Sequence, residues 1–186
     1  EKYKRGIITK THLSDLLRIS LLARYGGIWL DSTFFCTGDI QPYFDMPVWS
    51  IKRPDYRHVS VACGEFANYS FGCTTEYRKV FAILREYLLD YWEHYDYMID
   101  YLFLDYLIVL ARKQNDYVNQ AFNEIIPNNK NCDELLKVLG TTFDSSEWEK
   151  LKDNTELFKL TWKAAFPIEQ NGKETFYKKL MNNELV

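Results

Sequence analysis

Several features that mark common classes of protein are missing from this sequence. The longest apolar stretch, residues 101–111, is too short to span a bilayer and carries Asp105 in its middle. No secretory leader is recognisable. The four cysteines form no CxxC pair and have no zinc-site spacing with the three histidines. We therefore expect free thiols in a reducing compartment, with a disulfide between Cys63 and Cys73 as the alternative.

The sequence also has no excess of positive charge. It holds 23 lysines and arginines against 26 aspartates and glutamates, so no broad basic surface is expected and nucleic acid is not an expected partner. Internal repeats, low-complexity tracts and Pro/Gly/Ser-rich linkers are absent as well. These absences predict a single domain over residues 1–186, with no transmembrane segment.

Aromatic residues are abundant, with 14 tyrosines, 12 phenylalanines and 5 tryptophans. Rings of this kind often line sugar sites, because a ring face packs on C–H groups while a hydroxyl or indole N–H forms hydrogen bonds. Most of these rings are better explained as members of an aromatic-rich core. Composition therefore permits a carbohydrate ligand but does not identify one.

Apolar periodicity and turn residues predict helices that alternate with short strands, which is the pattern of an α/β fold. Helices are expected over residues 12–25, 75–94, 97–112, 117–127 and 132–139, with a further one opened by a capping box at residues 144–147. Strands are expected over residues 28–30, 48–51, 59–62, 69–73 and 158–163.

The first helix and the strand after it carry the most informative pattern. Thr11 is the expected N-cap, and a stripe of leucines is expected to form the buried face (Leu13, Leu16, Leu17 and Leu21). Two glycines, at positions 26 and 27, end this helix, because glycine adopts positive φ without steric cost. A short apolar strand follows and ends at Asp31.

Three charged residues in this segment are candidate ligand contacts. Asp15 and Arg18 lie three positions apart and share one face of the helix, either as an exposed ion pair or as part of a site. Asp31 ends a strand, where ligands of α/β proteins bind. A carboxylate there reaches ribose or sugar hydroxyls directly or through a metal, while an arginine holds hydroxyl or phosphate oxygens.

The stretch from Ser14 to Thr33 resembles the capsular polysaccharide synthesis proteins, relatives of the yeast-type mannosyltransferases and the large clostridial glucosylating toxins. Their shared pattern is an S-D-x-x-R helix, a Y-G-G turn and a strand that ends in a DXD-like motif. A weaker resemblance extends through residues 92–105 to 158–163. The family resemblance implies a GT-A-like (Rossmann-like) core. It also implies a retaining bacterial glycosyltransferase that takes part in surface polysaccharide synthesis. Such an enzyme would be cytoplasmic or peripheral at the inner membrane face. The donor would be a nucleotide sugar, and the acceptor an oligosaccharide or lipid-linked glycan.

The same resemblance assigns roles to individual residues. Asp15 would contact ribose or sugar hydroxyls of the donor, and Arg18 its sugar or phosphate. Asp31 would be the first carboxylate of the DXD-like motif and a catalytic residue. Thr33 stands where many relatives have the third, metal-binding carboxylate. Asp31 and Thr33 are therefore expected to hold Mg²⁺ or Mn²⁺ only weakly, with donor phosphates supplying most ligands.

Three further residues are candidates outside this segment. Asp105 lies among apolar residues of its helix and either acts on hydroxyls and the oxocarbenium-like transition state or bonds a neighbouring tyrosine. Lys163 lies on the polar side of the last expected strand and either neutralises the departing diphosphate or is solvated. Asn68 is placed on the acceptor side by the resemblance alone.

The resemblance also leaves an alternative function open. The look-alike proteins begin with a strand–helix segment that carries part of the nucleotide pocket, whereas this sequence begins a few residues before the S-D-x-x-R helix. We therefore expect an N-terminally truncated core. Thr33 and the missing segment favour a non-catalytic sugar-binding or regulatory homologue, while Asp15, Arg18 and Asp31 favour the enzyme.

Overall fold

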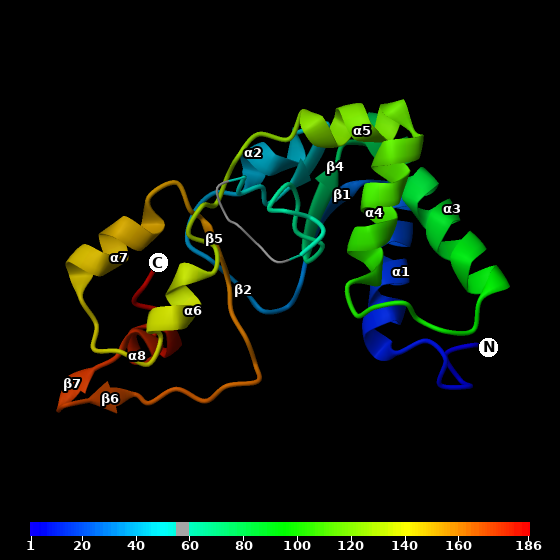
Figure 1. The fold of residues 1–186 in the computed structure, drawn as a ribbon. Coiled ribbons are helices and arrows are strands. Elements are labelled where there is room, and N and C mark those ends of the chain that lie inside the picture. Colours follow the sequence, from blue (N-terminus) through cyan, green and yellow to red (C-terminus); the bar gives the residue numbers. More distant parts are fainter. Residues whose placement is uncertain (55–59) are drawn as a thin grey trace. The chain divides into compact units, whose positions relative to one another are not determined.

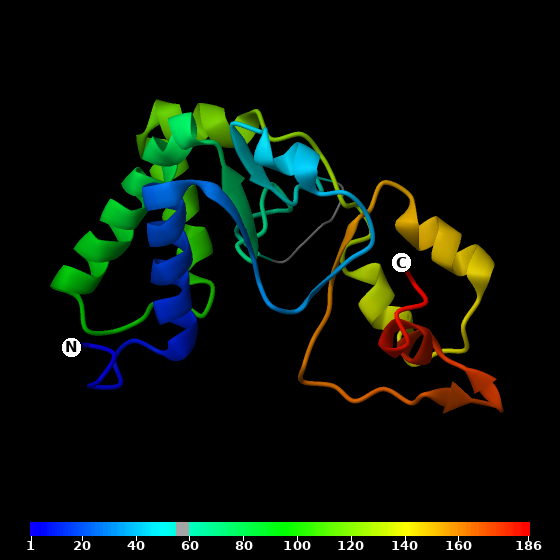
Figure 2. The same ribbon diagram turned by 180° about the vertical axis from the view of Figure 1, so that it is seen from behind.

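The computed structural model describes residues 1–54 and 60–186. The chain forms two compact units (Figures 1 and 2), and each is an assembly of helices with short strands. Unit 1 comprises Glu1–Leu30 and Gln41–Pro127, and unit 2 comprises Asp31–Ile40 and Asn128–Val186. Within the described residues, no helix has the length and apolarity needed to cross a bilayer.

Unit 1 contains a three-stranded antiparallel sheet. Its strands are β1 (Gly27–Leu30), β3 (Val48–Ser50) and β4 (Ser70–Cys73), in the order β1-β4-β3. Every residue of β4 is buried, as expected for the central strand of a covered sheet. The register places Gly27 and Val48 opposite Cys73.

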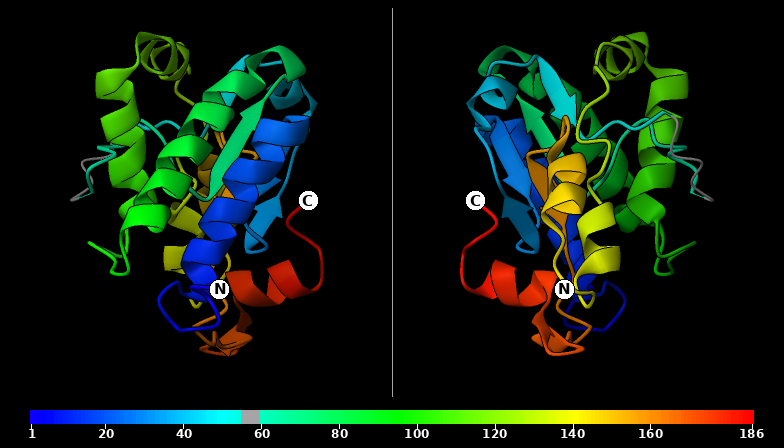
Figure 3. Two further views of the ribbon diagram at one scale, coloured as in Figure 1. Left: turned by 90° about the vertical axis from the view of Figure 1, so that its right-hand side faces the viewer. Right: turned by 90° about the vertical axis from the view of Figure 1, so that its left-hand side faces the viewer.

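Helices complete unit 1 around one hydrophobic core. They are α1 (Lys10–Tyr25), α2 (Gln41–Phe44), α3 (Arg78–His94) after a 3₁₀ turn η1 (Thr75–Tyr77), α4 (Phe103–Gln114) and α5 (Asp116–Asn123). Helices α1 (blue) and α3 (green) run side by side in Figure 3, and α3 also packs on α4. Phe71 of the central strand and Phe81 of α3 are fully buried and meet edge to face, with ring centroids 5.7 Å apart.

Unit 2 has a hydrophobic cluster of its own. Strands β2 (Phe34–Cys36) and β5 (Leu157–Lys159) pair antiparallel, and β6 (Glu169–Gln170) and β7 (Lys173–Glu174) form a short hairpin. Helices α6 (Glu134–Val138), α7 (Ser145–Lys152) and α8 (Phe176–Met181) surround the cluster. Leu135, Phe158 and Phe176 in this cluster have no exposed surface.

Most of the expected elements are present, and the α/β class is confirmed. Helices α1, α3, α5, α6 and α7 and strands β1, β3 and β4 lie within a few residues of their expected bounds, and Asp144 caps α7 as expected, with its side chain accepting from the N–H of Glu147. Helix α4 begins six residues later than expected. The GT-A-like arrangement of the sheet stays a prediction, as does the single domain over residues 1–186.

Helix α1 corrects two details of the sequence analysis. Its N-cap is Thr9, whose hydroxyl accepts from the N–H of His12, and not Thr11. Its buried face is also different from the expected leucine stripe: Leu17 is 51% exposed, whereas Asp15 and Arg18 are each 5% exposed. The reason is tertiary, because polar partners in the rest of unit 1 accept the charged side chains inside.

Two expected strands are also corrected. Residues 60–62 of the strand expected over 59–62 form a bend and turns, and Val59 lies outside the described residues. The strand expected over residues 158–163 ends at Lys159, and Trp162 is 79% exposed. Its partner β2 has only three residues, so the ladder closes with the bond from the N–H of Leu160 to the carbonyl of Thr33 (2.9 Å).

Candidate functional site

A buried polar network in unit 1 joins four of the predicted site residues. The guanidinium of Arg18 lies 3.2 Å from the carboxylate of Asp15, and its Nη1 donates to the backbone carbonyl of Asn68. The side-chain amide of Asn68 donates to Asp105 Oδ1 over 2.8 Å. Helix α1, helix α4 and the loop before β4 thus meet through polar side chains. The structure brings together residues that lie far apart in the sequence.

Burial determines the electrostatics of this network. Asp15, Arg18 and Asp105 are each 5% exposed, so two carboxylates share the interior with one guanidinium. Removal from water raises the pKa of Asp105 to about 6; its hydrogen bond from Asn68 opposes the shift, and the charge of Asp15 adds to it. The network therefore contains a carboxyl group, that of Asp105, whose pKa burial raises to about 6.

Asn68 is the member of the network that is least enclosed. It is half-buried, whereas the three charged residues are buried. Arg18 holds its backbone and Asp105 holds its side chain. The arginine also lies over the ring of Trp29 in β1, with its guanidinium carbon 5.5 Å from the ring centroid. These contacts fix the position of Asn68, the half-buried member of the network.

Unit 2 contains a second polar group, built around Asp31. Asp31 follows β1 directly and opens the turn that leads into β2, where the N–H of Phe34 donates to its carbonyl (3.2 Å). The ammonium of Lys159, on β5, lies 3.6 Å from Asp31 Oδ2 and donates to the hydroxyl of Thr33. The side chains of Lys159 and Asp31 are 20% and 30% exposed.

The residues expected to bind a metal ion do not fit a standing metal site. The Lys159 ammonium contacts both Asp31 and Thr33, and a divalent cation between them would be repelled by it. In the described part of the chain, no group of three or more His, Cys, Asp or Glu residues is arranged to hold an ion. That an ion arrives with the donor phosphates stays a prediction.

Lys163 is not part of the Asp31 group. It is exposed, follows the end of β5 by four positions, and its ammonium lies 5.9 Å from the ring centroid of Trp162. Lys159 was not among the residues predicted from the sequence, although it lies on the same side of an alternating strand over residues 158–163 as Lys163. The signal that separates them is strand pairing, because Lys159 is opposite Phe34 in the ladder.

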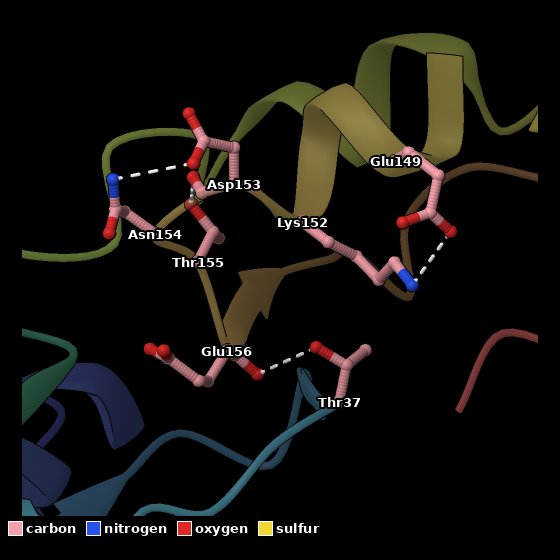
Figure 4. A pocket seen from close by; sticks show the side chains of 7 residues that line it. All are labelled: Thr37, Glu149, Lys152, Asp153, Asn154, Thr155 and Glu156. Atoms are coloured by element: carbon pink, nitrogen blue, oxygen red, sulfur yellow. Dashed lines mark hydrogen bonds and ion pairs between the residues drawn. The ribbon is translucent and has the colours of Figure 1, made fainter. Parts of the chain in front are cut away.

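A cavity of about 460 Å³ in unit 2 holds none of the predicted site residues (Figure 4). Three of its charged lining residues form ion pairs: Lys152 with Glu149 (2.9 Å), and Asp153 with Lys130, which lies outside the lining. Figure 4 shows the carboxylate of Glu156 pointing away from Lys152, while its backbone carbonyl accepts from the hydroxyl of Thr37. We do not assign a ligand to this cavity.

Comparison with known protein families gives a match over nearly the whole chain. A family described as capsular polysaccharide synthesis protein matches residues 1–180. No curated protein and no solved structure matches the chain. The matched range contains the network around Arg18 in unit 1 and the group around Asp31 in unit 2. The chain therefore belongs to the capsular polysaccharide synthesis protein family.

Proposed function

We propose that this protein is a retaining glycosyltransferase that transfers a hexose from a nucleoside-diphosphate sugar to a glycan acceptor in capsular or other surface polysaccharide synthesis. The observation that carries the proposal is the family match, which covers nearly the whole chain. The S-D-x-x-R, Y-G-G and D-x-T motifs lie within that match. We also propose that both units belong to one GT-A-like catalytic domain.

The proposed roles follow the accessibility of the side chains. In unit 1, Asn68 contacts donor or acceptor hydroxyls, because the residue is only half-buried while Arg18 holds its backbone carbonyl and Asp105 holds its side-chain amide. The carboxylate of Asp15 neutralises the arginine, so that this buried charge is paired. Direct contacts of Asp15 and Arg18 with the donor remain predictions from the resemblance, and a direct role of Asp105 remains a prediction from its burial among apolar residues.

In unit 2, we assign Asp31 to the donor sugar. A carboxylate near the anomeric carbon stabilises the oxocarbenium-like charge that develops in glycosyl transfer. In that step, the bond from the anomeric carbon to the diphosphate oxygen breaks and its electron pair leaves with the diphosphate. The acceptor oxygen forms the new bond on the same face, and its proton passes to the departing diphosphate.

The test is transfer of radiolabelled hexose from UDP-, GDP-, ADP- and dTDP-hexoses to oligosaccharide and lipid-linked acceptors. The same samples are analysed for released nucleoside diphosphate. We expect Asp31→Asn to lower the transfer rate about a hundredfold or more, as for loss of a group that stabilises transition-state charge. Its free energy of unfolding should stay within about 0.5 kcal/mol of the unmodified protein, because Asp31 is partly exposed.

Asp45→Asn is the matched control, since Asp45 is an exposed carboxylate outside the proposed site. It should leave transfer unchanged. A protein that binds a nucleotide sugar but never turns it over would instead be a non-catalytic sugar-binding homologue. Equal transfer by Asp31→Asn and the unmodified enzyme would remove Asp31 from the mechanism.

A further inference from the structure

Lys159 occupies the place where the D-x-T motif would hold a metal ion. Its ammonium lies 3.6 Å from Asp31 Oδ2 and donates to Thr33 Oγ1, so it contacts both side chains that the motif offers. One positive charge thus already stands between the two oxygen groups. A divalent ion at the same position would have to displace the lysine first.

The backbone holds this lysine in register with the motif. The N–H of Lys159 donates to the carbonyl of Cys132 over 2.8 Å, and the N–H of Leu160 donates to the carbonyl of Thr33 over 2.9 Å. Its residue pair in the ladder is Phe34, and its ammonium lies 5.7 Å from that ring centroid. The position of the charge therefore follows from the pairing of β2 with β5 and does not depend on a mobile loop.

We propose that Lys159 is the resident cation of this site and binds the diphosphate of the donor in place of a divalent metal ion. The inference rests on the proposed function, because it assigns the leaving group of that reaction to a named residue. A lysine ammonium is a compact charge with three N–H donors, which suits phosphate oxygens. Asp31 and Thr33 hold the ammonium in place before the donor arrives.

The role of Lys159 in the transfer step is electrostatic. As the bond from the anomeric carbon to the diphosphate oxygen breaks, its electron pair moves onto the diphosphate. The ammonium keeps its protons and donates hydrogen bonds to that oxygen as negative charge grows there. No redox change and no further co-reactant is required.

Inorganic pyrophosphate and Mn²⁺ are the probes, measured by calorimetric titration on the full chain. The unmodified protein should bind pyrophosphate equally well with Mn²⁺ and with EDTA. Lys159→Met keeps the apolar stem and removes the charge, so binding in EDTA should weaken about tenfold or more, as for a lost charged hydrogen bond. Mn²⁺ should restore it, since Asp31 and Thr33 are then released for the ion.

Two further variants separate charge from structure. Lys159→Arg keeps a cation at the same position and should retain binding in EDTA. Lys152→Ala removes a lysine that is also paired with a carboxylate, Glu149, on the same unit, and should change nothing. Binding of Mn²⁺ alone is measured by electron paramagnetic resonance, which follows the concentration of free Mn²⁺ without pyrophosphate. Addition of Lys159→Met should lower that concentration more than addition of the unmodified protein.

The inference is overturned if pyrophosphate binding by the unmodified protein requires Mn²⁺, or if Lys159→Met binds normally in EDTA. It is also overturned if Lys159→Met loses binding together with thermal stability and Mn²⁺ restores neither, because Lys159 is then structural. Sugar transfer is measured separately. The expected pyrophosphate pattern without transfer would reject the proposed function alone, and transfer without that pattern would reject the role of Lys159 alone.

Discussion

Asp105 is the residue whose burial has the clearest consequence in solution. Its pKa rises from 3.8 to about 6, mainly because the carboxyl is removed from water. Between these two values, the folded chain holds a proton that the unfolded chain has already released. The contribution of Asp105 to the free energy of unfolding therefore falls as pH rises from about 4 to about 6, and it stays low above that range.

We expect Asp105→Asn to remove this dependence. Relative to the unmodified protein, the variant should gain roughly 2–3 kcal/mol in free energy of unfolding between about pH 4 and pH 6, which corresponds to a shift of about two pKa units. The asparagine oxygen still accepts from Asn68, so the geometry is kept. Urea unfolding across pH 4–8 gives this difference directly. If the difference in free energy of unfolding between the two proteins does not change with pH, the pKa of Asp105 is not raised by folding.

Asp144 provides a contrast of opposite sign. Its pKa is lowered by the hydroxyl of Ser146 and by the backbone N–H of Glu147 at the start of α7. Its stabilising contribution is therefore present above about pH 4 and is lost as pH falls further. Asp144→Asn should show no relative gain between pH 4 and pH 6, which separates the effect of burial from that of removing any carboxylate.

At the scale of elements, the turn between α1 and β1 is constrained by two consecutive glycines with positive φ. Gly26 has φ +70° and Gly27 has φ +85°. A Cβ on Gly26 would lie 2.9 Å from the carbonyl oxygen of Cys73, whereas a Cβ on Gly27 would meet no atom within 4 Å. A substitution at Gly27 therefore tests backbone strain alone, whereas one at Gly26 tests backbone strain together with the close approach to β4.

Alanine substitutions should reveal that separation. Gly27→Ala is expected to cost about 1–2 kcal/mol, because only the positive φ is strained. Gly26→Ala should cost about 1–3 kcal/mol more, because β4 must also shift to admit the methyl group. Thermal and urea unfolding measure both variants. Equal losses would mean that the turn relaxes away from Cys73 without cost.

At the scale of the whole molecule, each unit has its own hydrophobic cluster. Leu84 of α3 belongs to the cluster in unit 1, and Leu135 of α6 belongs to the one in unit 2. Their exposed fractions are 1% and 0%. Truncating a buried leucine to alanine lowers the free energy of unfolding by about 2–5 kcal/mol. The truncation leaves a cavity, and the side chains that line this cavity lose packing contacts.

We expect Leu135→Ala to speed native-state hydrogen exchange mainly in unit 2, and Leu84→Ala mainly in unit 1. A single catalytic domain can contain several units that unfold cooperatively. Separate responses of the two units would therefore describe how the protein unfolds and would not contradict the proposed single catalytic domain. Exchange followed by mass spectrometry locates the affected peptides. Faster exchange throughout the chain in either variant would show that the two clusters unfold as one.

Interactions between residues close in the sequence determine where several elements begin and end, and these could be predicted from the sequence alone. The glycine pair ends α1 because few other residues tolerate positive φ, and the strand after it delivers Asp31 at its end. The same local rules failed at α1, where they placed the leucines inside and left open whether Asp15 and Arg18 are exposed. Helical periodicity names the faces of a helix, but neighbours from elsewhere in the chain decide which face is buried.

The composition of both polar groups was decided by tertiary structure. Arg18 meets Asn68 across 50 positions of the sequence, and Lys159 meets Thr33 across 126. Helical spacing, turn residues and strand ends act over a few positions, so they predicted Asp15, Arg18, Asp31 and Asp105 as candidates one by one, and Asn68 was predicted from the family resemblance alone. Only strand pairing and core packing select partners over such separations, and for that reason they determined that Lys159, and not Lys163, lies beside Asp31.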